Sequence, residues 1–477
     1  MSLKSQAISG VKWNSIATIY NMVIQVLRIA ILTRLLEKSD FGLVAIATMV
    51  ISFTDIFSDL GFTVAVIHKQ NVSKEQFSSL YWVNLFTSTI LFIIVALSSP
   101  LFASFYHEPI LNIIIPLLGI QIFLNAFGKL FQTIKTKNLE FRFLSIVRIS
   151  SITIGLIVTT LLALWGLGIY SLIIGQLVQV GINQLCYAIA GSKEMKVSFH
   201  FKYSEISEFV KIGIYQIGAN FLDFVSNKID IFLIGRFFGM DDLGIYNLAK
   251  DLVLKPKQII ATLINGVISS AFAKIQQDLA LVRETYKKLV DIVTFIALPI
   301  FILMSIYAEP IVTILYSAEY VEVASLLRTL SIVGLFMTID SLASTVVLAF
   351  GRTEIGFYWT IVRVVLSAVT IVVASTMSIE AVAWGQVVVA VLSFFLFWRF
   401  AIYSIIKLRL LPYIGAMTKN CMIAMIVSVP FVIQYSFYTP GYTFAILLFA
   451  IYFIIYGIVS FIFRKDLIVS LKKILHK

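Results

Sequence analysis

Residues 34–42 read RLLEKSDFG, and residues 236–244 read RFFGMDDLG, 202 residues later. Each copy joins two long apolar segments, so each is expected to end one helix and begin the next. Two further matches follow in the same order, PLFASFY (100–106) with PIVTILY (310–316) and Gly175-Gln176 with Gly385-Gln386, both 210 residues apart. Three matches at nearly constant spacing predict that a unit of about six helices is duplicated.

The segments around these matches are too apolar for a water-soluble protein. Of the 477 residues, 60% are hydrophobic and only 13% are charged, and the mean hydropathy is +0.97. A soluble domain is nearer to about half apolar and about a quarter charged. Stretches of about 20 apolar residues, enough to cross a bilayer, recur along the chain. They lack the alternation of barrel strands, so an all-α integral membrane protein is predicted.

The chain is expected to cross the membrane about fourteen times. The spans are placed near 11–35, 41–67, 77–98, 109–129, 144–164, 168–190, 210–236, 242–273, 287–308, 322–350, 355–376, 379–403, 413–435 and 442–463. Loops after even-numbered spans, together with both ends of the chain, hold about 25 Lys and Arg residues, Lys129 among them, whereas loops after odd-numbered spans hold three. Positive charge gathers on the cytoplasmic side, so both termini are predicted to be cytoplasmic.

The duplication predicts two six-helix lobes of the same orientation, related by an axis along the membrane normal. The expected divisions are an N-terminal lobe (1–191), a cytoplasmic linker (192–210), a C-terminal lobe (211–406), and helices thirteen and fourteen with the tail (407–477).

Two of the predicted helices carry polar stripes. Spacings of 4-3-4-3 place five polar residues on one face of the first helix, and the seventh helix repeats the pattern 202 residues later. The stripes are Asn14, Thr18, Asn21, Gln25 and Arg28, and Gln216, Asn220, Asp223, Asn227 and Asp230.

The second helix of each lobe is also polar along one face. These residues are Thr48, Ser52, Asp55 and Asp59 in the first lobe, and Asn247, Lys250 and Lys257 in the second. A charge at the bilayer centre costs at least about 2.5–3.5 kcal/mol, so such side chains face one another or a wet cavity. Mutual pairing, for example of Arg28 with Asp55 or Asp230, is one interpretation. A hydrated substrate cavity between the lobes is the favoured one.

The candidate substrate-binding residues are Asn21, Gln25, Arg28, Asp55, Asp59, Asn220, Asp223, Asn227, Asp230, Lys250, Lys257 and Arg363. Arg363 is included because it lies well inside the predicted eleventh span, whereas Asp340 is a weaker candidate near a helix end.

Sequence signatures of catalysis and of cofactor or metal binding are missing. The chain has no GxxxxGK[ST], HExxH, GxSxG or CxxC, and only four histidines, so neither a cofactor, a metal nor an enzymatic activity is expected. Cys186 and Cys421 leave a disulfide open. The net charge of +12 is attributed to cytoplasmic loops, not to nucleic-acid binding. No cleavable signal peptide is evident.

Several segments resemble a known family. ISGVKWNSIAT near the start, RLLEKSDFGLVAIATMVISFTDIFSDLGF, SLYWVN (79–84) and YNLAKDLVLKPKQIIATLINGVISSAFAKIQQD (246–278) are similar to polysaccharide flippases, and most closely to the colanic-acid-exporter-like branch of lipopolysaccharide and O-antigen (Wzx-type) transporters in the MOP superfamily. The resemblance extends through the predicted twelfth helix.

This resemblance implies fourteen helices in two lobes around a cationic cavity. It also implies alternating access and the movement of an undecaprenyl-diphosphate-linked oligosaccharide across the bacterial inner membrane, from the cytoplasmic to the periplasmic leaflet. The expected partners are that lipid-linked oligosaccharide, membrane lipids, and the polymerase and glycosyltransferases of the same pathway.

Two other functions stay open. A MATE-type drug/cation antiporter also has two six-helix lobes, and a multidrug-susceptibility assay would separate it from a flippase. A membrane polysaccharide polymerase or ligase is the other alternative, and neighbouring genes would distinguish it.

Overall fold

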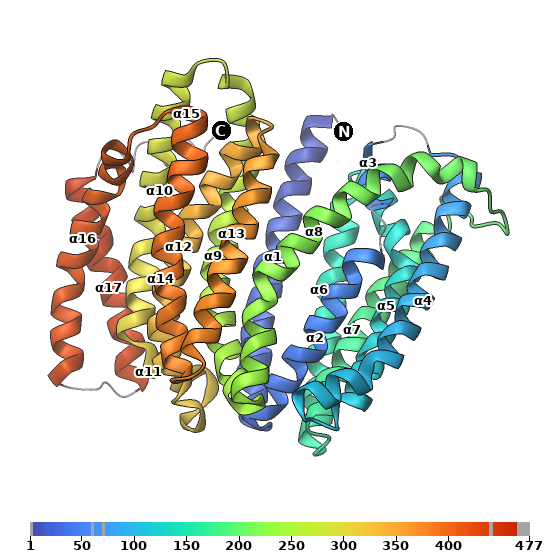
Figure 1. Cartoon of the computed structure of the whole chain (residues 1–477), viewed down its shortest axis with the longest axis horizontal. Coiled ribbons are helices and arrows are strands. Elements are labelled where there is room, and N and C mark those ends of the chain that lie inside the picture. Colours follow the sequence, from blue (N-terminus) through green and yellow to red (C-terminus); the bar gives the residue numbers. More distant parts are fainter. Residues whose placement is uncertain (1–2, 59–61, 69–71, 438–441, 465–477) are drawn as a thin grey trace. The chain divides into compact units, whose positions relative to one another are not determined.

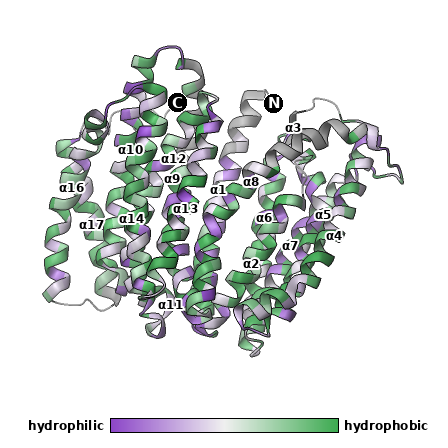
Figure 2. Ribbon diagram, in the orientation of Figure 1, coloured by the Kyte–Doolittle hydropathy of each residue, from purple (hydrophilic) through white to green (hydrophobic). Residues whose placement is uncertain are grey.

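The computed structural model of the chain describes residues 3–58, 62–68, 72–437 and 442–464. Across these ranges the regular secondary structure is helical and contains no strand (Figure 1). Twelve of the described helices are long and apolar enough to cross a membrane, and hydrophobic residues dominate many of their ribbons (Figure 2). The predicted all-α integral membrane class is confirmed.

The chain divides into two compact units, Met1–Gly244 and Ile245–Lys477. The first contains α1 (Leu3–Leu32), α2 (Lys38–Ser58), α3 (Phe62–His68), α4 (Lys74–Tyr106), α5 (Leu111–Lys137), α6 (Phe141–Leu164), α7 (Ile169–Gly191), α8 (Tyr203–Phe238) and the first turn of α9 (Met240–Ile275). The predicted lobes 1–191 and 211–406 describe the sequence repeat and stay a prediction.

The second unit contains the rest of α9 and all later helices. These are α10 (Leu279–Ile306), α11 (Ala308–Tyr316), a 3-10 turn η1 (Ala318–Tyr320), α12 (Val323–Ala349), α13 (Thr353–Ala374), α14 (Ile379–Phe397), a π-helical segment η2 (Trp398–Tyr403), α15 (Ser404–Ile406), α16 (Leu410–Phe437) and α17 (Tyr442–Phe463).

Some helices begin or end at other residues than the predicted spans, because capping residues set the helix ends. α4 is longer than the predicted 77–98 because Ser73 and Gln76 form a capping box at its start, and His107 adopts a left-handed conformation after its end. The predicted second span is divided between α2 and α3. Lys129, expected in a loop, lies inside α5, eight residues before its end at Lys137.

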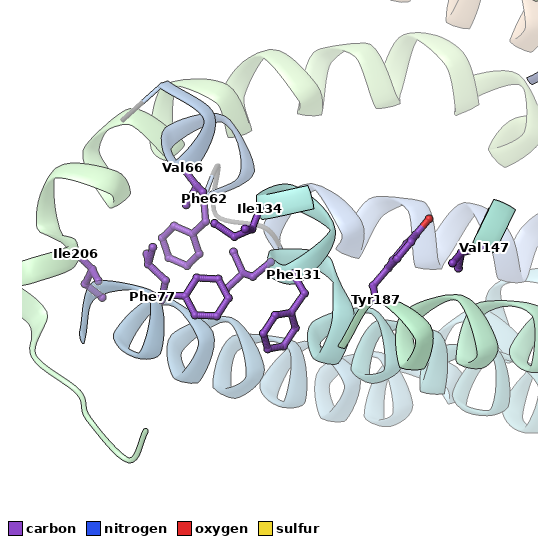
Figure 3. Packing of buried hydrophobic residues seen from close by; sticks show 10 residues of the cluster. Phe62, Val66, Phe77, Phe131, Ile134, Val147, Tyr187 and Ile206 are labelled. Carbon is purple, nitrogen blue, oxygen red and sulfur yellow. The ribbon is translucent and has the colours of Figure 1, made fainter. Parts of the chain in front are cut away.

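A hydrophobic cluster holds α3 against α4, α5 and α8 in the first unit. Phe62 and Val66 on α3 are fully buried there, together with Phe77 on α4 and Ile206 on α8. The rings of Phe77 and Phe131 lie 5.2 Å apart, and Figure 3 shows how these side chains converge. The short helix α3 is therefore held by its packing against longer helices.

The sequence repeat recurs as a packing repeat. A Cβ on Gly175 of α7 would lie 1.8 Å from Oγ1 of Thr159 on α6. A Cβ on Gly385 of α14 would lie 2.5 Å from Cγ2 of Thr370 on α13. In both units a glycine thus allows two neighbouring helices to approach more closely than a side chain permits.

The two matching loop sequences meet within the first unit. Gly42 at the start of α2 lies against Met240 at the start of α9, because a Cβ on Gly42 would be 2.0 Å from the Met240 carbonyl oxygen. Gly244 lies in the same way against Lys38, with a Cβ-to-oxygen distance of 2.0 Å. This contact is reciprocal, since each glycine faces the residue four positions before the other.

A buried polar network fixes the last helices. Arg464, directly after α17, has only 2% of its surface exposed and forms an ion pair with Asp291 on α10. Its guanidinium also donates to Oδ1 of Asn420 on α16. The Asn420 amide in turn donates to Oδ1 of Asp291 (2.9 Å) and to Oγ1 of Thr294 (2.9 Å). Three helices of the second unit are thereby joined through one charge pair.

Candidate functional site

The polar stripe of α1 is partly exposed along the helix. Asn21, Gln25 and Arg28 are half-buried, and the Gln25 amide donates to Oδ1 of Asn21 over 3.2 Å. On another face of α1, the Tyr20 hydroxyl lies 2.7 Å from Oγ1 of Thr153 on α6. The helix therefore packs against α6 while its stripe retains exposed surface.

The stripe of α8 is the most exposed of the set. Asn220, Asp223 and Asn227 are exposed, and the Asn227 amide donates to the Asp223 carbonyl over 2.8 Å. Asp230 is 7% exposed, and its Oδ1 accepts the Ile231 backbone N–H at 2.9 Å. Three of the four predicted binding residues on this helix are thus not covered by neighbouring side chains.

On α2, Asp55 is half-buried and interacts electrostatically with Lys129 of α5. The prediction placed Lys129 in a loop, so this partner was missed. Asp59, the other predicted residue of this stripe, lies outside the described residues.

Three ionisable residues come together in the second unit. Lys257 on α9 and Arg363 on α13 both act electrostatically on the carboxylate of Asp340 on α12. All three are half-buried, as is Lys250, a further cation on α9. The structure thus unites two predicted binding residues with an acid that the sequence ranked lower. The wider prediction of one shared cavity for all twelve residues stays a prediction.

An apolar cleft opens between α10, α12 and α16 in the second unit. Its volume is about 580 Å³, and aliphatic residues such as Ile332, Leu335 and Val429 line it. The hydroxyls of Ser331 and Ser428 on its wall donate to backbone carbonyls of their own helices, both over 2.6 Å. With these hydroxyls satisfied, the wall presents an apolar surface inside the membrane region.

The segment SLYWVN anchors the stretch that follows α7. The Trp82 indole N–H donates to the Ser198 carbonyl over 2.9 Å, and its ring stacks on Phe199 with centroids 5.1 Å apart. The Ser79 hydroxyl accepts the Lys202 backbone N–H at 3.1 Å. Residues quoted for the family resemblance therefore hold the predicted linker against α4.

The described residues contain no group of three or more His, Cys, Asp or Glu side chains that could hold a metal ion. Cys186 and Cys421 are both free.

A family model described as "Polysaccharide biosynthesis protein" matches residues 31–325. Two curated proteins are similar along most of their length. The chain is 28% identical over 423 residues to "Teichuronic acid biosynthesis protein TuaB" of Bacillus subtilis (strain 168), covering 88% of this chain and 87% of that protein. It is 25% identical over 379 residues to "Lipopolysaccharide biosynthesis protein WzxC" of Escherichia coli (strain K12), covering 79% and 77%.

The fold is also similar to that of a solved transporter. The structure titled "Lipid II flippase MurJ, inward closed conformation" matches with a TM-score of 0.75 at 15% sequence identity, covering 95% of this chain and 99% of that one. At this identity the likeness concerns the fold.

Proposed function

Because this chain belongs to the polysaccharide biosynthesis protein family, we propose that it is a flippase for a lipid-linked oligosaccharide. The substrate is an oligosaccharide joined through a diphosphate to undecaprenol, and it moves from the cytoplasmic to the periplasmic leaflet of the bacterial inner membrane. The similarity to biosynthesis proteins for teichuronic acid and lipopolysaccharide supports a glycan substrate. The fold shared with a lipid II flippase supports a lipid-linked one.

The observation that carries this proposal is the cationic cluster on α9, α12 and α13 of the second unit. Lys257 and Arg363 both interact with the carboxylate of Asp340. A diphosphate cannot cross hydrocarbon without compensation of its charge, and Lys and Arg are the side chains that bind phosphate oxygens. Polar side chains of α1 and α8, such as Asn21 and Asn220, can bond to sugar hydroxyls.

The prenyl tail needs no polar site. The cleft between α10, α12 and α16 is apolar and lies on helices that qualify as membrane spans. A hydrocarbon chain fits such a surface without loss of hydrogen bonds. The diphosphate and the tail are thus bound by different parts of the second unit.

Orientation and movement are part of the same proposal. The excess of Lys and Arg in alternate loops supports a cytoplasmic position for both termini. Transport proceeds by alternating access, in which the two repeats rock against each other. No bond of the substrate is made or broken, so the protein is a transporter that receives its substrate from glycosyltransferases and delivers it to a polymerase.

Substitution of two cations tests the proposal. Lys257→Ala and Arg363→Ala remove charge from α9 and α13, and each is expected to abolish surface glycan in a strain lacking the native gene while the membrane level stays unchanged. Lys288→Ala is the matched control, since the Lys288 side chain is 68% exposed and forms an exposed ion pair with Glu284 one turn away on the same helix. Wild-type surface glycan with both Lys257→Ala and Arg363→Ala would contradict the cationic site. Loss of drug resistance in the gene-deletion strain would favour the antiporter instead.

A further inference from the structure

The repeat carries one electrostatic pair with reversed polarity. In the first unit an acid on α2, Asp55, interacts with a lysine on α5, Lys129. In the second unit a lysine on α9, Lys257, interacts with an acid on α12, Asp340. Lys257 follows Asp55 by 202 residues, the offset of the matching loops, and Asp340 follows Lys129 by 211, the offset of the two packed threonines on α6 and α13. α5 and α12 themselves begin and end 212 residues apart, so the two pairs join corresponding helices and lie within one residue of equivalent positions.

Helix packing brings together the helices that carry each pair. In the first unit α2 packs directly against α5. In the second unit a Cβ on Gly334 of α12 would lie 2.5 Å from Cγ1 of Val253 on α9, so these helices touch. At a rise of about 1.5 Å per residue, Lys257 lies about 6 Å and Asp340 about 9 Å beyond this contact. Of the described helices between α9 and α12, only α10 qualifies as a membrane span, so both displacements run the same way.

The reversal leaves the pair intact but changes what the stripe presents. Coulomb attraction does not depend on which helix carries which sign, so either polarity stabilises the helix contact. The stripe of α2, however, carries the acid Asp55, whereas the stripe of α9 carries the cations Lys250 and Lys257. Arg363 then adds a second cation beside Asp340. The second unit therefore presents a basic surface, and the cations of this surface still lie near an acid.

We propose that Asp340 is the resident counter-ion of the diphosphate site on the second unit. The Asp340 carboxylate pairs with Lys257 and Arg363 when no substrate is bound. When the diphosphate binds, its oxygens replace the carboxylate as the partner of both cations. This inference rests on the flippase function proposed above. Asp340 is a positioning residue, because it acts on substrate through the two cations.

The chemistry of the two anions favours this exchange. A diphosphate has more charge and more acceptor oxygens than one carboxylate, so it competes successfully for a guanidinium and an ammonium group. A cation inside a membrane is costly without a partner, so the returning carboxylate also promotes release of the substrate. Removal of Asp340 is therefore expected to strengthen binding and to slow transport.

Binding and export of four variants test the inference. The full-length protein in nanodiscs is titrated with undecaprenyl diphosphate, and with undecaprenol as the probe that lacks phosphate. Asp340→Asn is expected to bind the diphosphate about tenfold more tightly, equivalent to about 1.4 kcal/mol, and to export less glycan. Asp340→Glu keeps the charge and is expected to bind like the parent.

The double variant K257D/D340K gives the second unit the polarity of the first. It is expected to retain the parent's melting temperature and to lose diphosphate binding. The matched control E284K/K288E reverses an exposed pair on α10 whose atoms lie 2.8 Å apart, and it is expected to bind normally.

The outcomes separate the inference from the proposed function. Parent-like binding by K257D/D340K, or binding by Asp340→Asn that is no tighter than the parent's, would overturn the counter-ion role and leave the flippase proposal standing. If K257D/D340K does not fold, Asp340→Asn and Asp340→Glu decide the matter alone. A parent protein that binds undecaprenol as well as undecaprenyl diphosphate would overturn the flippase proposal itself.

Discussion

Gly42 and Gly244 touch each other at equivalent positions of the two repeats: a Cβ on Gly244 would lie 3.2 Å from the Gly42 backbone nitrogen. The same Cβ would be 2.0 Å from the Lys38 carbonyl oxygen, so no side chain fits there. Within the first unit, the first turn of α2 is thus held against the first turn of α9 through backbone contact.

Gly42→Ala and Gly244→Ala are expected to force these two helix turns apart. Overpacking costs about 1–3 kcal/mol, so both variants should melt at a lower temperature and export less glycan than the parent. Gly415→Ala is the control, because no atom lies within 4 Å of the added Cβ and Gly415 sits within α16. Equal melting temperatures for Gly42→Ala and Gly415→Ala would show that the contact is not closely packed.

Arg464→Met is expected to loosen the last two helices. The substitution leaves the Asp291 carboxylate without the cation that pairs with it, and breaking a buried pair costs about 3–5 kcal/mol. The double variant D291N/R464M removes both charges and should recover much of the loss. Thermal unfolding of the purified variants measures the difference. If the double variant is no more stable than Arg464→Met, the pair is not the source of the effect.

Trp82→Ala is expected to release the segment after α7 from α4. It removes both the hydrogen bond to Ser198 and the stacking on Phe199, whereas Trp82→Phe removes only the hydrogen bond. Limited proteolysis between residues 192 and 203 should therefore be fastest for the alanine variant and intermediate for phenylalanine. Identical cleavage rates for the parent and Trp82→Ala would contradict this docking.

Val429→Trp is expected to fill part of the apolar cleft. Val429 lines the cleft and is 53% exposed, while Val369 on α13 is 57% exposed and does not line it. If the prenyl chain occupies the cleft, Val429→Trp reduces export and Val369→Trp does not. Equal export by the two variants would place the prenyl chain elsewhere.

The stripes and the repeat could be predicted from the sequence because both depend on spacing along one chain. A period of 3.6 residues groups Asn21, Gln25 and Arg28 on one face whatever surrounds the helix. The matching loop sequences likewise contain Gly42 and Gly244, which are 202 residues apart in the sequence and are in contact in the structure.

Partners on other helices could not be predicted in this way. Lys129 was assigned to a loop because it is charged and follows an apolar run, yet α5 continues to Lys137 and brings it to Asp55. Arg464 directly follows the last predicted span (442–463), where an exposed cation is expected, but it is 2% exposed beside Asp291. Which helices pack together decides both cases, and spacing along the chain does not contain that information.

Movement of a labelled substrate between leaflets tests the central claim most directly. Purified protein is reconstituted into vesicles that contain a fluorescent undecaprenyl-diphosphate oligosaccharide in both leaflets, and a membrane-impermeant quencher is added outside. The flippase account predicts that label from the inner leaflet becomes quenched only in vesicles with the protein, while a labelled phospholipid does not. Equal quenching with and without the protein would contradict it.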